Sequence, residues 1–106
     1  MTLIEFLKST ERNAWVEHPD FKNLYVRQGP MYLEEERHDT IVLANMTVND
    51  PGHGTFSSLI YFLRAVYPYK WIYVESVQEE RFADYLLRLG FVEQPNVHRC
   101  YYLKGL

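Results

Sequence analysis

One stretch of the chain decides the fold. It runs from Thr40 to Phe91 and reads TIVLANMTVNDPGHGTFSSLIYFLRAVYPYKWIYVESVQEERFADYLLRLGF. Residues 41–48 are mostly apolar and predict a strand, and the loop at 50–54 that follows contains two glycines. An amphipathic helix is expected to begin at Thr55, because the next apolar side chains recur at helical spacing. These apolar residues are Phe56, Leu59, Ile60, Leu63, Val66 and Tyr67.

A second strand and a second helix complete the unit. Residues 71–75 are apolar until the final glutamate and predict the strand, while Gly90 is suited to end the helix that follows. Ser76 to Glu79 matches the pattern of a capping box at the start of this helix. Strand, glycine loop, helix and strand together predict a parallel βαβ unit.

The flanking segments predict antiparallel structure. A first helix is expected from Leu3, resuming after Thr10 and reaching Trp15. Strands at 23–28 and 31–35 are expected to form a hairpin, with Gly29-Pro30 as its turn. A last strand is predicted from Arg99 to Lys104. The sequence therefore predicts one α+β domain over residues 1–106, with a mixed, mostly antiparallel sheet and flanking helices.

Composition restricts the function classes. The 106 residues carry a formal charge of −3, which makes nucleic-acid binding an unlikely function despite nine tyrosines. No apolar run approaches the roughly 20 residues of a membrane span, and no signal peptide is recognised, so we expect a cytoplasmic protein. Four histidines and one cysteine show no metal-ligand spacing, so no metal site is expected. His98 and Cys100 would share a strand face, where a buried structural cysteine is favoured over a nucleophile.

The glycine loop is the clearest candidate for ligand binding. The helix that begins at Thr55 has no acidic residue in its first turn, so backbone N–H groups are free to bind an anion. The later helix has Glu79 and Glu80 in the same place, and these would repel a phosphate. The alternative interpretation is a plain strand-to-helix turn, in which Gly52 and Gly54 serve only to allow positive φ angles.

Two nucleotide-binding motifs fit this loop poorly. A P-loop requires lysine and then serine or threonine after its last glycine, whereas the chain has Thr55-Phe56. A dinucleotide-binding motif fits better, because Gly52-x-Gly54-x-x-Ser57 is close to its pattern and Glu75 lies about twenty residues further on. Too little chain follows Glu75, however, for the remaining units of a doubly wound sheet.

From Thr40 to Phe91 the chain resembles the GNAT superfamily of acyl-CoA-dependent N-acyltransferases, in particular its compact single-domain phage-like versions. The resemblance rests on the strand, the glycine loop and helix, the second strand, and the closing Leu89-Gly90-Phe91. It implies a GNAT-like sheet, acetyl-CoA as co-substrate and direct acyl transfer to an amine. The acceptor amine, on a small molecule or on a protein, is not identified by the sequence. The cofactor-binding residues that it implies are Met46, Thr47, Val48, Gly52, His53, Gly54, Thr55 and Phe56.

The resemblance also suggests catalytic residues. These are Asn45, Glu75 and Tyr85. Asn45 and Thr47 are expected on the strand face that carries Ile41 and Leu43, and Glu75 is expected at the carboxyl edge of its strand as a base. A solvated rim carboxylate is the alternative for Glu75.

Three positions depart from the family pattern. The tyrosine that usually lies four residues before the glycine of Leu-Gly-Phe is Leu86 here, with Tyr85 beside it. The Gln/Arg of the glycine motif aligns with Pro51, and its second glycine with Phe56. A GNAT-like domain without activity, which acts as a small protein-interaction module, is therefore the alternative function.

Overall fold

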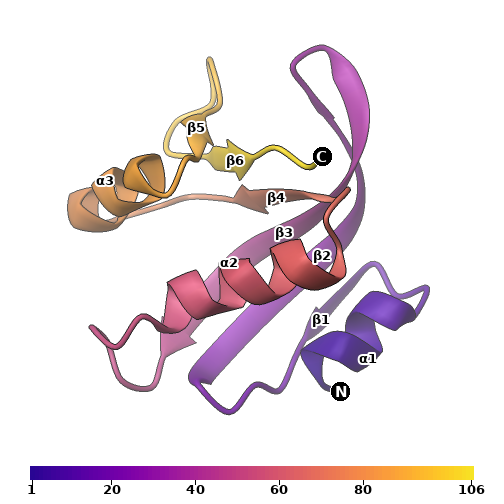
Figure 1. The fold of residues 1–106 in the computed structure, drawn as a ribbon, viewed down its shortest axis with the longest axis vertical. Helices are drawn as coiled ribbons and strands as arrows, with labels where there is room; N and C mark the ends of the chain where they lie inside the picture. Colours follow the sequence, from indigo (N-terminus) through magenta and orange to yellow (C-terminus); the bar gives the residue numbers. More distant parts are fainter.

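The computed structural model describes residues 1–106 as three helices and six strands (Figure 1). Their order along the chain is α1 (Leu3–Lys8), β1 (Asn13–Trp15), β2 (Phe21–Leu33), β3 (Glu36–Val48), α2 (Thr55–Val66), β4 (Trp71–Val74), α3 (Glu80–Arg88), β5 (Val92–Glu93) and β6 (Tyr101–Leu103). The strands form one sheet in the order β1-β2-β3-β4-β6-β5. Only β3 and β4 run parallel, joined by α2; every other neighbouring pair is antiparallel. This confirms the predicted α+β class with a parallel βαβ unit.

The long β2–β3 hairpin differs from the prediction. Its turn lies at Glu34 and Glu35, whose φ angles of 53° and 66° both fall in the left-handed region, as in tight two-residue hairpin turns. The expected turn at Gly29-Pro30 is wrong, because β2 continues through these residues in register with Thr40 and Asp39 of β3. Proline is tolerated here because β1 pairs with β2 only as far as residue 27, which leaves an open edge.

The N-terminal segment also corrects the prediction. α1 ends at Lys8, and residues 13–15 form a strand instead of a second helical stretch. The Gln28 side chain stabilises this turn by donating hydrogen bonds to three carbonyls, those of Phe6, Ser9 and Glu11. These partners are distant in sequence, so tertiary pairing overrides the local helical spacing.

The capping box occurs at a different helix from the one expected. Thr2 and Glu5 form it at the start of α1. α3 begins after Glu79, whose side chain makes no capping bond, and Ser76 adopts a φ of 54° away from the helix. The serine therefore belongs to the bend that leads out of β4.

The two faces of the sheet are covered differently. The main core lies on one face and includes buried side chains from all three helices. The smaller cluster on the other face contains no helical residue. Its members are Leu33, Val42, Trp71, Tyr73, Cys100 and Tyr102. We call this second side the helix-free face.

The tip of the hairpin is fastened to the last strand. The Tyr102 hydroxyl donates to Glu34 Oε2 at 2.7 Å, and Lys104 Nζ lies 3.0 Å from the same oxygen. The hydrogen bonds from Tyr102 and Lys104 lower the pKa of Glu34. A lowered pKa means that the ionised carboxylate stabilises the folded chain above the ordinary pKa of glutamate, and that this contribution disappears as the pH falls through the lowered value.

We therefore expect Glu34→Gln to destabilise the protein at pH 7 and to have a smaller effect at pH 3. Urea unfolding midpoints at both values measure the difference. Glu36→Gln, at an exposed position beside the same turn, is the control. An equal loss at both pH values would show that the ionised carboxylate does not fasten the hairpin.

Candidate functional site

A cleft opens where the two parallel strands separate. β3 and β4 pair only from Thr40–Trp71 to Leu43–Val74, after which β3 continues to Val48. A cavity of about 950 Å³ lies beyond this point. It is lined by the second half of β3, the glycine loop, Phe56 of α2, residues 74–79 and three side chains of α3.

A β-bulge in β3 changes which side chains face the core. Val26 of β2 lies opposite Leu43, whereas its neighbour Tyr25 lies opposite Asn45. Ala44 is therefore an extra residue on β3. Because side chains alternate along a strand, one extra residue reverses the faces of all that follow.

The bulge corrects one sequence prediction. Met46 and Val48 pack against the main core, the side occupied by Ile41. Asn45 and Thr47 are exposed, so they do not share the face of Ile41 and Leu43 as expected. Asn45 pairs with Tyr25 and thus belongs to the helix-free face, at the margin of the cleft.

The start of α2 has unoccupied hydrogen-bond donors. None of the backbone N–H groups of residues 52–57 donates to a protein acceptor; the first to do so is that of Ser58, to Gly54. Gly54 is the N-cap residue, with a φ of 71°, no side-chain cap is present, and the first turn contains no acid. Gly52 has a φ of 87°. Both glycines are thus required by the backbone, and the loop they shape leaves its amides free.

Charged side chains surround this loop. His53 Nε2 lies 3.4 Å from Asp50 Oδ2, and both side chains are exposed. Arg81, from the first turn of α3, lines the cleft and forms no ion pair. Sequence reasoning missed Arg81, because the adjacent Glu79 and Glu80 made the start of α3 look purely acidic.

Glu75 forms an ion pair with Arg27 on the helix-free face. Arg27 Nη2 donates to Glu75 Oε2, joining β2 to the end of β4 across β3. The side chains are 43% and 26% exposed, respectively. Glu75 is therefore neither a free rim carboxylate nor a buried one. Arg27 lies 48 residues away in the sequence, and no local pattern could have indicated it.

Tyr73 is buried next to this pair. Its hydroxyl donates to Gln94 Oε1. Burial raises the pKa of Tyr73, and the neighbouring Cys100 thiol and Glu75 carboxylate raise it further. The phenol therefore remains protonated. Tyr73 is also not among the residues that line the cleft.

Tyr85 lines the cleft together with two other aromatic residues, Phe56 and Phe82. Its ring lies 6.3 Å from that of Phe56, and both residues line the cavity. Leu86, at the position where the resemblance led us to expect a tyrosine, is fully buried in the main core. Tyr85 is thus the tyrosine of α3 that reaches the cleft.

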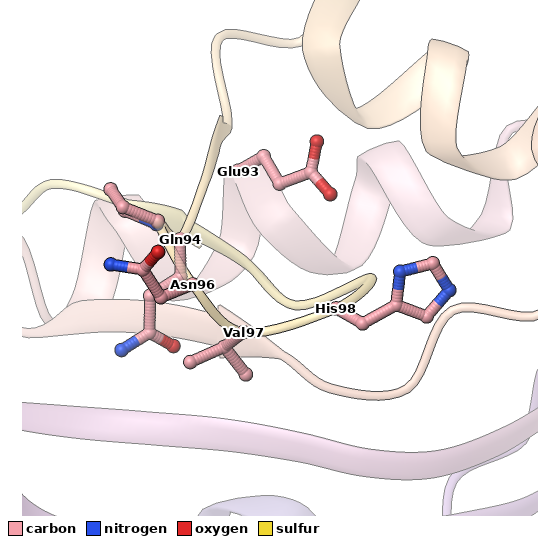
Figure 2. A pocket seen from close by; sticks show the side chains of 6 residues that line it. Glu93, Gln94, Asn96, Val97 and His98 are labelled. Atoms are coloured by element: carbon pink, nitrogen blue, oxygen red, sulfur yellow. The ribbon is translucent and has the colours of Figure 1, made fainter.

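The second hollow lies in the loop between β5 and β6. Its volume is about 510 Å³, and consecutive residues 93–98 line it. Figure 2 shows that the labelled side chains fan outward from this single loop. His98 is exposed and Cys100 is buried just before β6 begins, so the expected shared strand face does not exist. No hydrogen bond or ion pair joins Glu93 to His98, the two ionisable residues that line this hollow.

No group of three or more His, Cys, Asp or Glu side chains is arranged to hold a metal ion. None of the three helices is long and apolar enough to cross a membrane.

Comparison with known proteins identifies the fold only. No protein-family model and no curated protein sequence matches the chain. A solved structure of the AtaT mutant toxin, bound to the C-terminus of the antitoxin AtaR and to acetyl-CoA, matches with a TM-score of 0.54 and 11% identity. The match covers 76% of this chain and 56% of that one, so this chain spans little more than half the length of the toxin. The similarity supports the expected GNAT-like fold.

Proposed function

We propose that this domain binds acetyl-CoA in the cleft and transfers the acetyl group to an amine. The observation that carries the proposal is the row of free backbone amides at residues 52–57. These residues follow the part of β3 that no longer pairs with β4. Amides at an uncapped helix start bind phosphate groups well. The GNAT-like fold and the acetyl-CoA bound to the AtaT structure support the same assignment.

The remaining cleft residues suit a long, partly polar ligand. The pyrophosphate would bind the amides of Gly52 to Phe56, with Arg81 as an added positive charge and the His53 imidazole as a nearby hydrogen-bond donor. Residues 44–48 of β3 have no strand partner on the side of β4, so their backbone groups are free to pair with the amides of a pantetheine arm. Met46, Thr47 and Val48 would thus contribute mainly through their main chain.

The proposed reaction needs few side chains. Glu75 accepts a proton from the acceptor ammonium, and the resulting amine attacks the thioester carbonyl. A C–N bond forms, the C–S bond breaks, and the leaving sulfur takes the second amine proton, by way of Tyr85 or water. The net products are the N-acetyl amine, CoA thiol and one released proton. Asn45, on the helix-free face, would orient the acceptor.

A non-catalytic interaction module is the second candidate. The observation that favours it is the burial of Leu86 at the position where the GNAT pattern has its tyrosine, which leaves Tyr85 as the tyrosine of α3 that lines the cleft. The two candidates differ first in whether the domain binds CoA.

A thermal-shift titration with CoA and acetyl-CoA tests the proposal. At about 100 times the dissociation constant, a ligand stabilises the folded state by roughly 2.7 kcal/mol, which raises the melting temperature of a domain of this size by several degrees. We expect this rise with both compounds and none with free pantetheine at equal concentration. No response to millimolar CoA or acetyl-CoA would remove the transferase proposal in favour of the interaction module.

A further inference from the structure

We propose that the acceptor is an amine with a carboxylate close to it, as in an α-amino acid, and that Arg27 and Glu75 bind these two groups together. This inference rests on the proposed transferase function. It identifies Arg27 as the residue that determines acceptor specificity and excludes polyamines as preferred acceptors.

Arg27 has hydrogen-bond donors that no protein atom uses. A guanidinium has five N–H donors, and only Nη2 of Arg27 donates to a protein atom, Glu75 Oε2. By comparison, Arg64 donates to the Lys104 carbonyl and Arg99 pairs with Glu80, and neither arginine lines the cleft. The Arg27 side chain is 43% exposed, so its remaining donors are accessible to a ligand. The planar fork of these donors fits a carboxylate.

The charges of Arg27 and Glu75 are complementary to those of a zwitterion. Glu75 and Arg27 present a negative and a positive group in direct contact. An α-amino acid carries an ammonium and a carboxylate on one carbon atom, so its carboxylate can lie against Arg27 while its ammonium lies against Glu75, each next to a charge of opposite sign. A polyamine or a lysine side chain has no anion for Arg27 and would bring positive charge to a guanidinium. The ion pair therefore selects a zwitterion.

The Arg27–Glu75 pair lies at the margin of the cleft, on the helix-free face. Arg27 lies opposite Val42 on the helix-free face, and Glu75 lines the cleft in which the thioester would bind. Tyr25 and Asn45 lie side by side on the same face. No helical residue belongs to the cluster on this face, so the acceptor's side chain would extend into open space. The site would thus recognise the ammonium and carboxylate while tolerating different side chains.

Matched acceptors provide the test. The purified protein is assayed for release of CoA thiol from acetyl-CoA with L-alanine, L-alaninamide and cadaverine, and the assays are repeated with L-leucine and L-leucinamide. Each amide carries a neutral carboxamide in place of the carboxylate, so the comparison removes the negative charge while keeping the size of the acceptor. Arg27→Gln and Arg27→Lys are compared with Arg37→Gln, which removes an exposed, unpaired arginine at the far end of β3.

We expect the unmodified protein to prefer each free amino acid over its amide by about 10- to 100-fold in kcat/KM, the range for hydrogen bonds to a charged group. Arg27→Gln should lose this preference through a higher KM for the amino acid, Arg27→Lys should recover part of it, and Arg37→Gln should retain it. The CoA-induced rise in melting temperature should be unchanged in all three variants, which shows that each still folds and binds the co-substrate.

Three results would overturn the inference. Equal use of acids and amides, preferred use of cadaverine, or an unchanged acid preference in Arg27→Gln would each exclude the role of Arg27 while leaving the transferase proposal intact. Absence of the CoA-induced rise in the unmodified protein would instead remove the proposed function, and the acceptor inference with it.

Discussion

Ser57→Glu is expected to abolish the binding of CoA without unfolding the protein. Ser57 lies in the first turn of α2, where the backbone amides are free and no acidic residue is present. A glutamate there stabilises the helix by about 0.3–1 kcal/mol through the helix dipole, but it repels the pyrophosphate and competes for the same amides. The variant should melt at or above the temperature of the unmodified protein and show no rise with CoA.

A matched control separates position from charge. Tyr61→Glu places the same charge at a 76% exposed site on the same helix, about 6 Å further along its axis. It should retain the rise with CoA. Gly54→Glu is a poorer test, because the φ of 71° at Gly54 makes any side chain strained. If Ser57→Glu still responds to CoA as the unmodified protein does, the α2 amides do not bind the pyrophosphate.

Glu75→Gln is expected to lower the transfer rate by about 10²- to 10⁴-fold, the usual cost of losing a general base. Glutamine keeps the size of the side chain and accepts a hydrogen bond from Arg27, but it cannot take a proton from the acceptor. The dissociation constant for CoA, measured by the thermal shift, should remain nearly unchanged, because the proposed pyrophosphate contacts are made by the loop amides of residues 52–56 and not by Glu75.

Glu93→Gln is the control for this prediction, because Glu93 is exposed on β5 and outside the cleft. It should retain full activity. A normal rate for Glu75→Gln on an acceptor that the unmodified protein acetylates would exclude Glu75 as the base, and the Arg27–Glu75 pair would then serve only to join β2 to β4.

Local sequence determined the elements with strong periodic patterns. The apolar stripe of α2, the apolar run of β4 and the glycine loop were predicted at or near their observed limits. The same information placed Gly52 and Gly54 before an uncapped helix, because cap residues and first-turn acids are properties of consecutive residues. The parallel βαβ unit followed from these elements.

Tertiary pairing decided the elements with weak patterns. Residues 13–15 form a strand because they pair with the edge of β2. The hairpin turn lies at Glu34-Glu35 and not at Gly29-Pro30, because β3 pairs with β2 along its whole length. Each change exchanges a weak local preference for several hydrogen bonds between distant strands. Local propensity is overridden in such cases.

The proposed acceptor side of the cleft was determined almost entirely by the tertiary structure. The sequence indicated Asn45 and Glu75 as candidates, but the face of Asn45 depends on the bulge at Ala44, which exists only through register with β2. Arg27 reaches Glu75 because two strands distant in sequence flank β3. Whether an amide at a helix start is free depends on residues that are neighbours along the chain. An ion pair across a sheet depends instead on the order of the strands, which no local stretch of sequence determines.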